Sequence, residues 1–396
     1  MHGLITIEGV KKTVFGAGAL KELGNVARDL HASRLLLVTD RGLAKTNIPE
    51  RAEGILRDVG IETVPYQEIT PEPSPQLADE GAEIAKEKNV EAVIGLGGGS
   101  TMDVAKAIAV LVNNGGKVVD YIGLGLVKER GLPTIMVPTT AGTGSETTFT
   151  AVFTMREKKG KGGINSPFLY PSVAVLDPEL TLGLPREITA YTGMDALTHA
   201  LESYTSLQAH FMSEPVSLSA VKLIAGNIRE AVADGDSYGF RESMMKGSYL
   251  AGLGLAMAGV GAVHAMAYPL GAFFDIPHGI ANAVMLPYVF AHNCQSAVQK
   301  FCRIGEAMGL EREPGTSLDR AKGAVKAIFD LGGEIGIPRS LRELGIPEDA
   351  ISDMAEAAMK VERPMLNNPR PMNVQAVEEV YREAFEGNTD MIDRIE

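Results

Sequence analysis

The sequence is poor in cysteine: only Cys294 and Cys302 occur among 396 residues, and they form no metal-binding or redox motif. Thiols this scarce are typical of a reducing cytoplasm rather than of secreted, disulfide-linked domains. The N-terminal stretch MHGLITIEGVKK also lacks the apolar core of a signal peptide. We therefore expect a cytoplasmic protein.

A strong positive charge is lacking as well. The formal net charge is −13, and acidic and basic residues are mixed along the chain. This balance argues against a polyanionic partner such as nucleic acid and favours small-molecule ligands. With 396 residues, 45% of them hydrophobic, the chain is long enough for two or three domains with large cores.

Charged residues are absent altogether from the stretch 249–274. This run is long enough to cross a bilayer. It is rich in Ala and Gly and contains Pro269, whereas membrane spans favour Leu, Ile, Phe and Val. We therefore predict a helix that is buried inside the protein and packed closely through small residues, with no membrane association.

The two halves of the chain have different patterns. Short apolar runs that end in polar or glycine residues lie at 34–40, 91–100, 133–146 and 172–177. Continuous apolar strands alternating with helices indicate a parallel, Rossmann-like sheet covered on both faces, with ligands at the carboxyl ends of its strands. Helical periodicity dominates the second half. The prediction is an α/β domain over 1–184 and an all-α domain over 185–396.

The segment GLGGGSTMDVAK places Gly97, Gly98 and Gly99 between an expected strand and an expected helix. Glycines let the backbone approach a ligand closely, and the free N–H groups of a helix start suit a diphosphate. The G-x-G-x-x-G fingerprint is missing, because Ser100 stands where its last glycine would be. A tight turn in which Ser100 caps the helix and Asp103 completes a capping box explains the segment equally well.

A second loop, PTTAGTGSE at 138–146, also follows an expected strand and is dense in glycine and small hydroxyl residues. Two such loops at one sheet edge could close over both ends of a dinucleotide. Asp40 ends an earlier strand, where its carboxylate could accept hydrogen bonds from a ribose diol and would repel a 2′-phosphate. A simple turn is the alternative interpretation of Asp40.

Two histidines stand in or beside the uncharged run, His264 within it and His278 just after it. The segment TGMDALTHALE sets Asp195 and His199 four residues apart, so that on a helix they share one face. One carboxylate with three imidazoles suits a divalent first-row metal, which would offset the cost of burying imidazole among Ala and Gly. The alternative for each histidine is a hydrogen-bonded core residue.

Together, five segments resemble the iron-containing (group III) alcohol dehydrogenases. They are GGGSTMDVAK, PTTAGTGSE, SPFLYPSVAVLDPELT, TAYTGMDALTHALE and VHAMAYPLGAFFDIPHG. The similarity runs from FGAGAL at 15–20 to PHG at 277–279 and is expected to weaken after about residue 290. It implies a dinucleotide-binding α/β domain followed by an all-helical metal domain, with the active site in the cleft between them.

The resemblance also implies roles for single residues. The ligands of Fe²⁺, or of Zn²⁺ as an alternative, would be Asp195, His199, His264 and His278. NAD, or NADP as the alternative, would be bound by a diphosphate loop, the helix turn after it and a second loop. A lysine would lie near the ribose, and an aspartate would favour NAD over NADP. The residues in these positions are Gly97, Gly98, Gly99, Ser100, Asp103, Thr139, Thr140, Thr143, Lys161 and Asp40.

One position departs from the family pattern. Many members carry a further histidine four residues after the third ligand, and here Tyr268 stands in that place. A phenol can donate or relay a proton, although its ordinary pKa is about 10, against about 6.5 for histidine. The alternative is a packing residue whose hydroxyl finds a local partner. Phe149 and Thr150, which follow the second loop, are expected to face the substrate.

The implied activity is hydride transfer between NAD(H) and a small primary alcohol, diol or functionalised aldehyde, in a homodimer or larger homo-oligomer. Two other interpretations stay open. One is an NAD- and metal-dependent lyase of dehydroquinate-synthase-like architecture, although the segments around the expected ligands lack the basic cluster that an anionic substrate needs. The other is a non-catalytic nucleotide or metal sensor.

Overall fold

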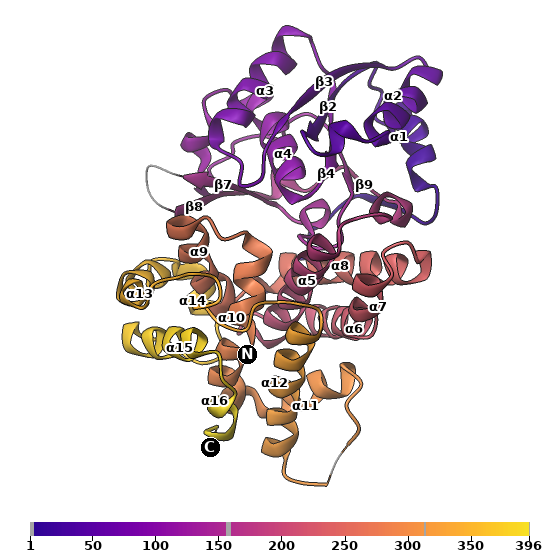
Figure 1. Ribbon diagram of the computed structural model, residues 1–396. Coiled ribbons are helices and arrows are strands. Elements are labelled where there is room, and N and C mark those ends of the chain that lie inside the picture. The colour runs from indigo at the N-terminus through magenta and orange to yellow at the C-terminus, as the bar shows by residue number, and fades with distance from the viewer. Residues whose placement is uncertain (1–3, 156–159, 313, 396) are drawn as a thin grey trace. The chain divides into compact units, whose positions relative to one another are not determined.

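The computed structural model describes residues 4–155, 160–312 and 314–395 (Figure 1). The chain divides into two compact units, with the boundary between Leu182 and Gly183. Within the described residues, all strands belong to the first unit, and the second unit is built from helices. The predicted fold class, an α/β unit followed by an all-α unit, is confirmed.

The first unit contains a six-stranded sheet in which every neighbouring pair is parallel, in the order β1-β9-β6-β4-β2-β3. The strands are β1 (Lys12–Phe15), β2 (Arg34–Asp40), β3 (Glu62–Ile69), β4 (Ala92–Gly97), β6 (Thr134–Pro138) and β9 (Val173–Leu176). Because all of them run the same way, their carboxyl ends share one edge. The adjacent strands β2, β4 and β6 therefore bring Asp40, the glycine turn and the second loop to neighbouring positions.

Helices cover both faces of this sheet. Along β2, Leu36 and Val38 belong to one buried cluster and Leu35 and Leu37 to another, because successive side chains alternate between the faces. The first cluster includes residues of α3 and α4, and the second includes residues of α1 and α2, which lie on opposite sides of the sheet in Figure 1. These helices are α1 (Leu23–Asp29), α2 (Ile48–Asp58), α3 (Pro75–Glu87) and α4 (Gly99–Asn114).

The first unit also contains a three-stranded sheet that the sequence analysis did not predict. It consists of β5 (Gly123–Leu124), β8 (Gly160–Asn165) and β7 (Thr150–Met155), and β7 and β8 pair antiparallel. The sequence of β8, GKGGIN, has no alternation of apolar and polar residues, and only Ile164 in it is buried. A strand with so little apolar pattern gives no period-2 signal.

The second unit is a set of helices, as the helical periodicity of the second half predicts. Stretches with this periodicity at 193–206, 324–336 and 373–387 overlap α5, α12 and α15. The pattern at 215–235 is divided between α6 and α7. The helices are α5 (Arg186–Thr205), α6 (Ser213–Ala225), α7 (Ile228–Ala233), α8 (Tyr238–Ala258), α9 (Ala262–Phe274), α10 (His278–Asn293), α11 (Val298–Ala307), α12 (Ser317–Glu334), α13 (Ile351–Met359), α14 (Glu362–Asn367), α15 (Val374–Glu386) and α16 (Asp390–Asp393).

The uncharged run forms the second half of α8 and the whole of α9. Gly254 of α8 approaches its neighbours so closely that a Cβ there would lie 2.3 Å from Ser217 Oγ of α6 and 2.8 Å from Ser203 Oγ of α5. Small residues thus permit close helix packing, in agreement with the prediction. In the described ranges no single helix is long and apolar enough to cross a membrane; α8 and α9 reach that length and composition only as a pair, bent by 104°.

Candidate functional site

The glycine turn lies at the carboxyl edge of the parallel sheet. Gly97 ends β4 with a φ of 157°, which residues with a side chain rarely adopt, and α4 begins at Gly99. The first N–H groups of an α-helix have no partner within the helix, so this turn can offer hydrogen-bond donors to an anion.

The capping-box interpretation of this turn is wrong. The N-cap residue of α4 is Gly98, and no side chain caps the helix. Asp103 instead accepts hydrogen bonds from Ser145 Oγ at 2.6 Å and from the backbone N–H of Val152 at 2.9 Å. Its carboxylate therefore ties α4 to the second loop and to β7, rather than to the start of its own helix.

The second loop packs directly against the glycine turn. The N–H of Thr139 donates to the carbonyl oxygen of Gly97 at 3.0 Å. A Cβ at Gly99 would lie 2.6 Å from Thr143 Cγ2, and a Cβ at Gly98 would lie 3.8 Å from Thr140 Oγ1. The structure thus brings the two predicted loops together, and position 99 accepts only a glycine without displacement of Thr143.

A buried lysine that the sequence analysis did not single out joins α4 to the second loop. The side chain of Lys106 is 0% exposed; its Nζ lies 3.2 Å from Asp103 Oδ1 and donates to the carbonyl oxygens of Ser145 at 3.0 Å and Thr150 at 2.5 Å. Burial lowers the pKa of Lys106, while Asp103 opposes this effect. Burial likewise raises the pKa of Glu146 to about 7, against the opposing effects of its own backbone N–H and of Lys106.

Asp40 and Lys161 both make protein contacts. Asp40 Oδ1 accepts hydrogen bonds from the N–H groups of Gly42 and Leu43 at 2.9 and 2.8 Å, which is the turn that the alternative interpretation describes. A ribose contact is compatible with this turn, because a carboxylate has a second oxygen. Lys161 of β8 forms an ion pair of 2.7 Å with Glu72. The contacts of both residues with a cofactor stay predictions.

Thr150 is the first residue of β7 and Phe149 directly precedes it; both are half-buried. The ring of Phe149 packs against that of Tyr170, with centroids 5.4 Å apart. Thr150 Oγ1 donates to Asn165 Oδ1 at 2.9 Å. That these two residues face a substrate stays a prediction.

Three of the four predicted metal ligands come together in the helical unit. Asp195 and His199 lie one turn apart on α5, and His264 lies in the first turn of α9. One donor atom from each side chain lies within 4.8 Å of the others, and all three residues are buried. The i, i+4 spacing on α5 therefore has the convergent geometry that the sequence predicts.

His278, the fourth predicted ligand, is the first residue of α10. Its Nε2 lies 3.9 Å from Asp195 Oδ1, and His264 Nε2 lies 4.0 Å from the same oxygen. Tyr268, one turn after His264 on α9, stacks on the His278 ring with centroids 5.7 Å apart. The structure thus gathers the predicted ligands and Tyr268 in one place.

Asn282 is a neighbour of this cluster that the sequence analysis missed. It is fully buried one turn after His278, and its Nδ2 lies 2.7 Å from Asp195 Oδ1 and 3.1 Å from the Nε2 atoms of both His264 and His278. The three atoms that could bind a metal, Asp195 Oδ1, His264 Nε2 and His278 Nε2, therefore all face the Asn282 amide nitrogen. The i, i+4 spacing from His278 was a signal available in the sequence.

Glu202 is a second missed neighbour. It lies on α5, three residues after His199, and its Oε2 is 2.5 Å from His264 Nδ1. Both side chains of this pair are buried. The sequence signal was the repetition of acidic and imidazole groups along one face of α5.

The donor set fits a divalent metal ion. Donor atoms that share one ion lie at most about 4 Å apart, because each is about 2.0–2.2 Å from it. The Asp195–His264 and Asp195–His278 distances given above are close to this limit. Burial alone would raise the pKa of Asp195, but the three imidazoles and the Asn282 amide together lower it, so that the carboxylate form is favoured.

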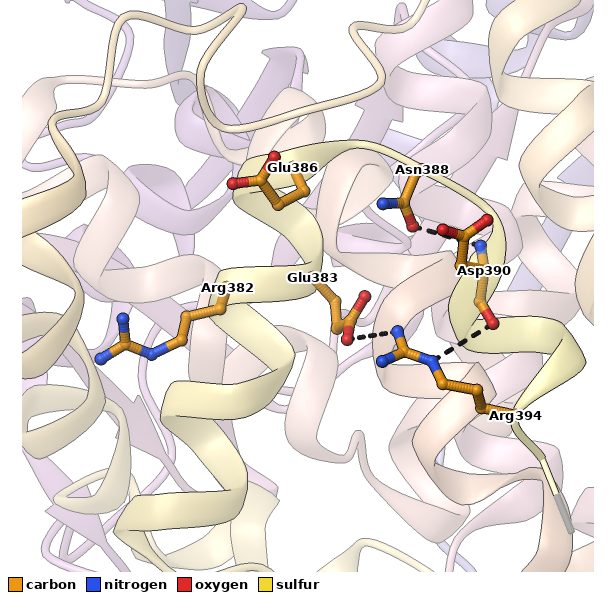
Figure 2. A pocket seen from close by; sticks show the side chains of 6 residues that line it. All are labelled: Arg382, Glu383, Glu386, Asn388, Asp390 and Arg394. Atoms are coloured by element: carbon orange, nitrogen blue, oxygen red, sulfur yellow. Dashed lines mark hydrogen bonds and ion pairs between the residues drawn. The ribbon is translucent and has the colours of Figure 1, made fainter.

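A hollow elsewhere in the helical unit shows no such chemistry. Figure 2 shows its lining, in which Arg394 contacts Glu383 and the carbonyl oxygen of Asp390. Its remaining lining residues are Arg382, Glu386 and Asn388. Arg382 and Glu386 make exposed ion pairs with Glu378 and Arg342. Exposed pairs of this kind contribute little, and we assign this hollow no role.

Comparison with protein families decides between the open interpretations. Residues 11–178 match the family described as "Iron-containing alcohol dehydrogenase". Residues 189–385 match the family described as "Fe-containing alcohol dehydrogenase family, C-terminal". The chain belongs to the iron-containing alcohol dehydrogenase family. The second match extends well beyond residue 290, after which the resemblance was expected to weaken. This iron-containing alcohol dehydrogenase is therefore an oxidoreductase of a family that acts on alcohols.

Individual relatives match almost the whole length of the chain. A 1,3-propanediol dehydrogenase of Citrobacter freundii is 39% identical over 373 residues, which cover 94% of this chain and 96% of the relative. The crystal structure of a 1,3-propanediol oxidoreductase superposes with a TM-score of 0.94 at 38% identity, covering 97% of this chain and 100% of that one. A sulfoacetaldehyde reductase from Bifidobacterium kashiwanohense, solved in complex with NAD⁺, has a TM-score of 0.87 at 30% identity, covering 98% of this chain and 100% of that one.

Proposed function

We propose that this protein interconverts a small primary alcohol or diol and the corresponding aldehyde, with NAD(H) as the hydride acceptor or donor. The observation that carries the proposal is the convergence of Asp195, His199, His264 and His278. The glycine turn that follows a parallel strand in the first unit supports a dinucleotide cofactor. The relatives that are named for propanediol and for sulfoacetaldehyde support a short substrate with a second polar group.

Asp195, His199, His264 and His278 would hold the metal, with Fe²⁺ as the expected ion and Zn²⁺ as the alternative. A divalent cation bound by these side chains supplies Lewis-acid stabilisation of the negative charge that develops on the substrate oxygen. The carboxylate of Asp195, which is buried, would offset part of the charge of the cation.

In this proposal the N–H groups of Gly97, Gly98, Gly99 and Ser100 hold the diphosphate of NAD at the start of α4. Thr139, Thr140 and Thr143 line the cofactor, and Asp103 and Lys106 position that second loop. The second carboxylate oxygen of Asp40 accepts from the ribose, and its charge disfavours the 2′-phosphate of NADP. Lys161 lies near the ribose.

Tyr268, Phe149 and Thr150 are proposed to contact the substrate. The ring of Tyr268 stacks on that of His278, beside the metal ligands. In aldehyde reduction its phenol would donate a proton to the substrate oxygen, and in alcohol oxidation it would relay the proton released by the alcohol to solvent. The half-buried ring of Phe149 and the hydroxyl of Thr150 would face the substrate. We further propose that the enzyme is a cytoplasmic homodimer or larger homo-oligomer, as the resemblance implies.

The test begins with enzyme freed of metal by a chelator and then reloaded with Fe²⁺ or Zn²⁺ without oxygen. Short aldehydes, including hydroxy- and sulfo-substituted ones, are supplied with NADH or NADPH, and the loss of reduced nicotinamide absorbance is followed. We expect turnover only in the reloaded enzyme, and faster with NADH. A metal-free enzyme that keeps its full rate would refute the proposal. Binding of NAD without turnover of any aldehyde or alcohol would indicate a sensor, and NAD-dependent elimination without net nicotinamide change would indicate a lyase.

A further inference from the structure

Glu202 is a buried carboxylate for which the proposed reaction has no direct use. It lies on α5 and is 3% exposed. An ionised carboxylate is costly to bury unless strong hydrogen-bond donors surround it. The partners of Glu202 therefore indicate what it does.

Both oxygens of Glu202 are used on the first turn of α9. Oε1 accepts a hydrogen bond from the backbone N–H of Val263 at 2.7 Å, and Oε2 lies 2.5 Å from His264 Nδ1. The carboxylate is thus fixed by one backbone group and one ring atom of adjacent residues. This two-point contact sets both the position of the turn and the rotation of the His264 ring.

The direction of the second hydrogen bond follows from the chemistry of imidazole. The neutral ring carries one proton and one lone pair, and His264 Nε2 is the atom that faces Asp195 and Asn282. A carboxylate at Nδ1 accepts a hydrogen bond from the Nδ1–H group, so that the ring proton stays on Nδ1 and the lone pair lies on Nε2. It also increases the electron density that Nε2 can donate to a cation.

We propose that Glu202 is a positioning residue for the metal: it holds His264 in the Nε2 lone-pair form and so raises the affinity of the site for a divalent cation. This inference rests on the proposed function, because it takes His264 to be a metal ligand. It assigns to Glu202 no contact with substrate, cofactor or metal.

A purely structural role is the competing explanation, and the chain offers a matched control for it. Asn368 also caps the first turn of α9, through its Oδ1 and the N–H of Ala262 at 3.3 Å, and it is equally buried. Its other hydrogen bonds go to Asn293 and to the carbonyl oxygen of Arg370. Substitution of Asn368 therefore disturbs the same turn without removing a contact from the imidazole.

The experiment compares full-length wild type, Glu202→Gln and Asn368→Ala, each freed of metal. Gln offers one amide oxygen where Glu offers two acceptors and a charge, so the ring or the backbone N–H must lose its partner. Zn²⁺ affinity is measured by competition with a chromogenic chelator, the absorption spectrum is recorded with Co²⁺, and folding is checked by thermal unfolding. We expect Glu202→Gln to weaken Zn²⁺ binding about 10- to 100-fold and to alter the Co²⁺ spectrum. Asn368→Ala should lower the unfolding temperature while the Zn²⁺ affinity changes less than about threefold.

Equal losses of affinity in the two variants, or no loss in Glu202→Gln, would overturn the inference. Should Glu202→Gln fail to fold, a crystal structure of the Zn²⁺-loaded wild type decides: Zn²⁺ on His264 Nε2 with Glu202 at Nδ1 supports the inference, and Zn²⁺ on Nδ1 or on Glu202 itself overturns it. A wild type that binds neither Zn²⁺ nor Fe²⁺ would instead refute the proposed function.

Discussion

The glycine turn of the first unit and the ligand cluster of the second are built in opposite ways. Gly97, Gly98 and Gly99 are consecutive and place backbone N–H groups between the end of β4 and the start of α4. The cluster takes one side chain from α9, one from α10 and two from α5. We expect the glycine turn to tolerate a change of charge on a neighbouring side chain but not the addition of a Cβ to one of its glycines. We expect the ligand cluster to tolerate a larger neighbouring side chain but not the loss of one metal-binding atom.

The largest expected effect is that of His278→Ala. Loss of one of four donors should empty the metal site and lower kcat/KM for aldehyde reduction by about 1000-fold, because Lewis-acid stabilisation contributes several kcal/mol to the transition state. Metal content and activity are measured together, with NAD⁺ binding by calorimetry as the measure of the first unit. We expect NAD⁺ affinity to stay within about threefold of wild type.

His292→Ala is the matched control for this prediction. His292 lies on the same helix and is half-buried; burial, followed by the charge of Arg370, lowers its pKa to about 4, so that its imidazole is neutral. It should keep its metal and its activity. A His278→Ala enzyme that retains both metal and rate would show that three donors suffice.

The next effect tests the buried ion pair that supports the backbone site. Lys106→Met leaves the carboxylate of Asp103 without its cation and should lower the free energy of unfolding by about 3–5 kcal/mol. Urea unfolding measures this loss, and Lys326→Met, which breaks an exposed i, i+4 pair with Asp330, should cost less than about 1 kcal/mol. Equal costs would mean that Lys106 does not hold the second loop.

Glu146 makes the stability of the first unit depend on pH. Its pKa is about 7 in the folded chain, above the ordinary value of 4.5, so between these values the folded state holds a proton that the unfolded state has released. The stability it contributes is full below pH 4.5 and is lost as pH rises through 7, by about 3 kcal/mol at most. Glu146→Gln stays neutral, so its urea stability relative to wild type should rise between pH 5 and pH 8. A constant difference would place the pKa of Glu146 in its ordinary range.

The smallest effect is that of one added methyl group. A Cβ at position 99 meets Thr143 at 2.6 Å, so Gly99→Ala should push the second loop away and raise the KM for NADH about tenfold. Metal content should not change. Gly99→Ala combined with Thr143→Gly removes the clash and should recover part of the loss; an unchanged KM in the single variant would show that the loop gives way freely.

Much of the first unit could be predicted because its strands are apolar on both faces. The runs at β2, β4, β6 and β9 stand out for this reason. Strands β1, β3 and β8 did not, because edge and half-exposed strands carry mixed residues that give no continuous apolar signal. The sequence pattern also suggested a capping box at Ser100 and Asp103, but Asp103 is bound by a loop more than forty residues away.

By itself, the sequence determined the local features of this protein: the turn at Gly97, the shared helix face of Asp195 and His199, and the apolar strands. These follow from backbone sterics and from periodicity, which act over a few residues. Only the tertiary structure decided the partners of the buried polar groups, such as Glu202 with His264, 62 positions apart, and Asn282 with Asp195, 87 positions apart. The reason is that burial obliges polar groups to find partners, but the packing of helices, not the spacing along the chain, selects which partners are within reach.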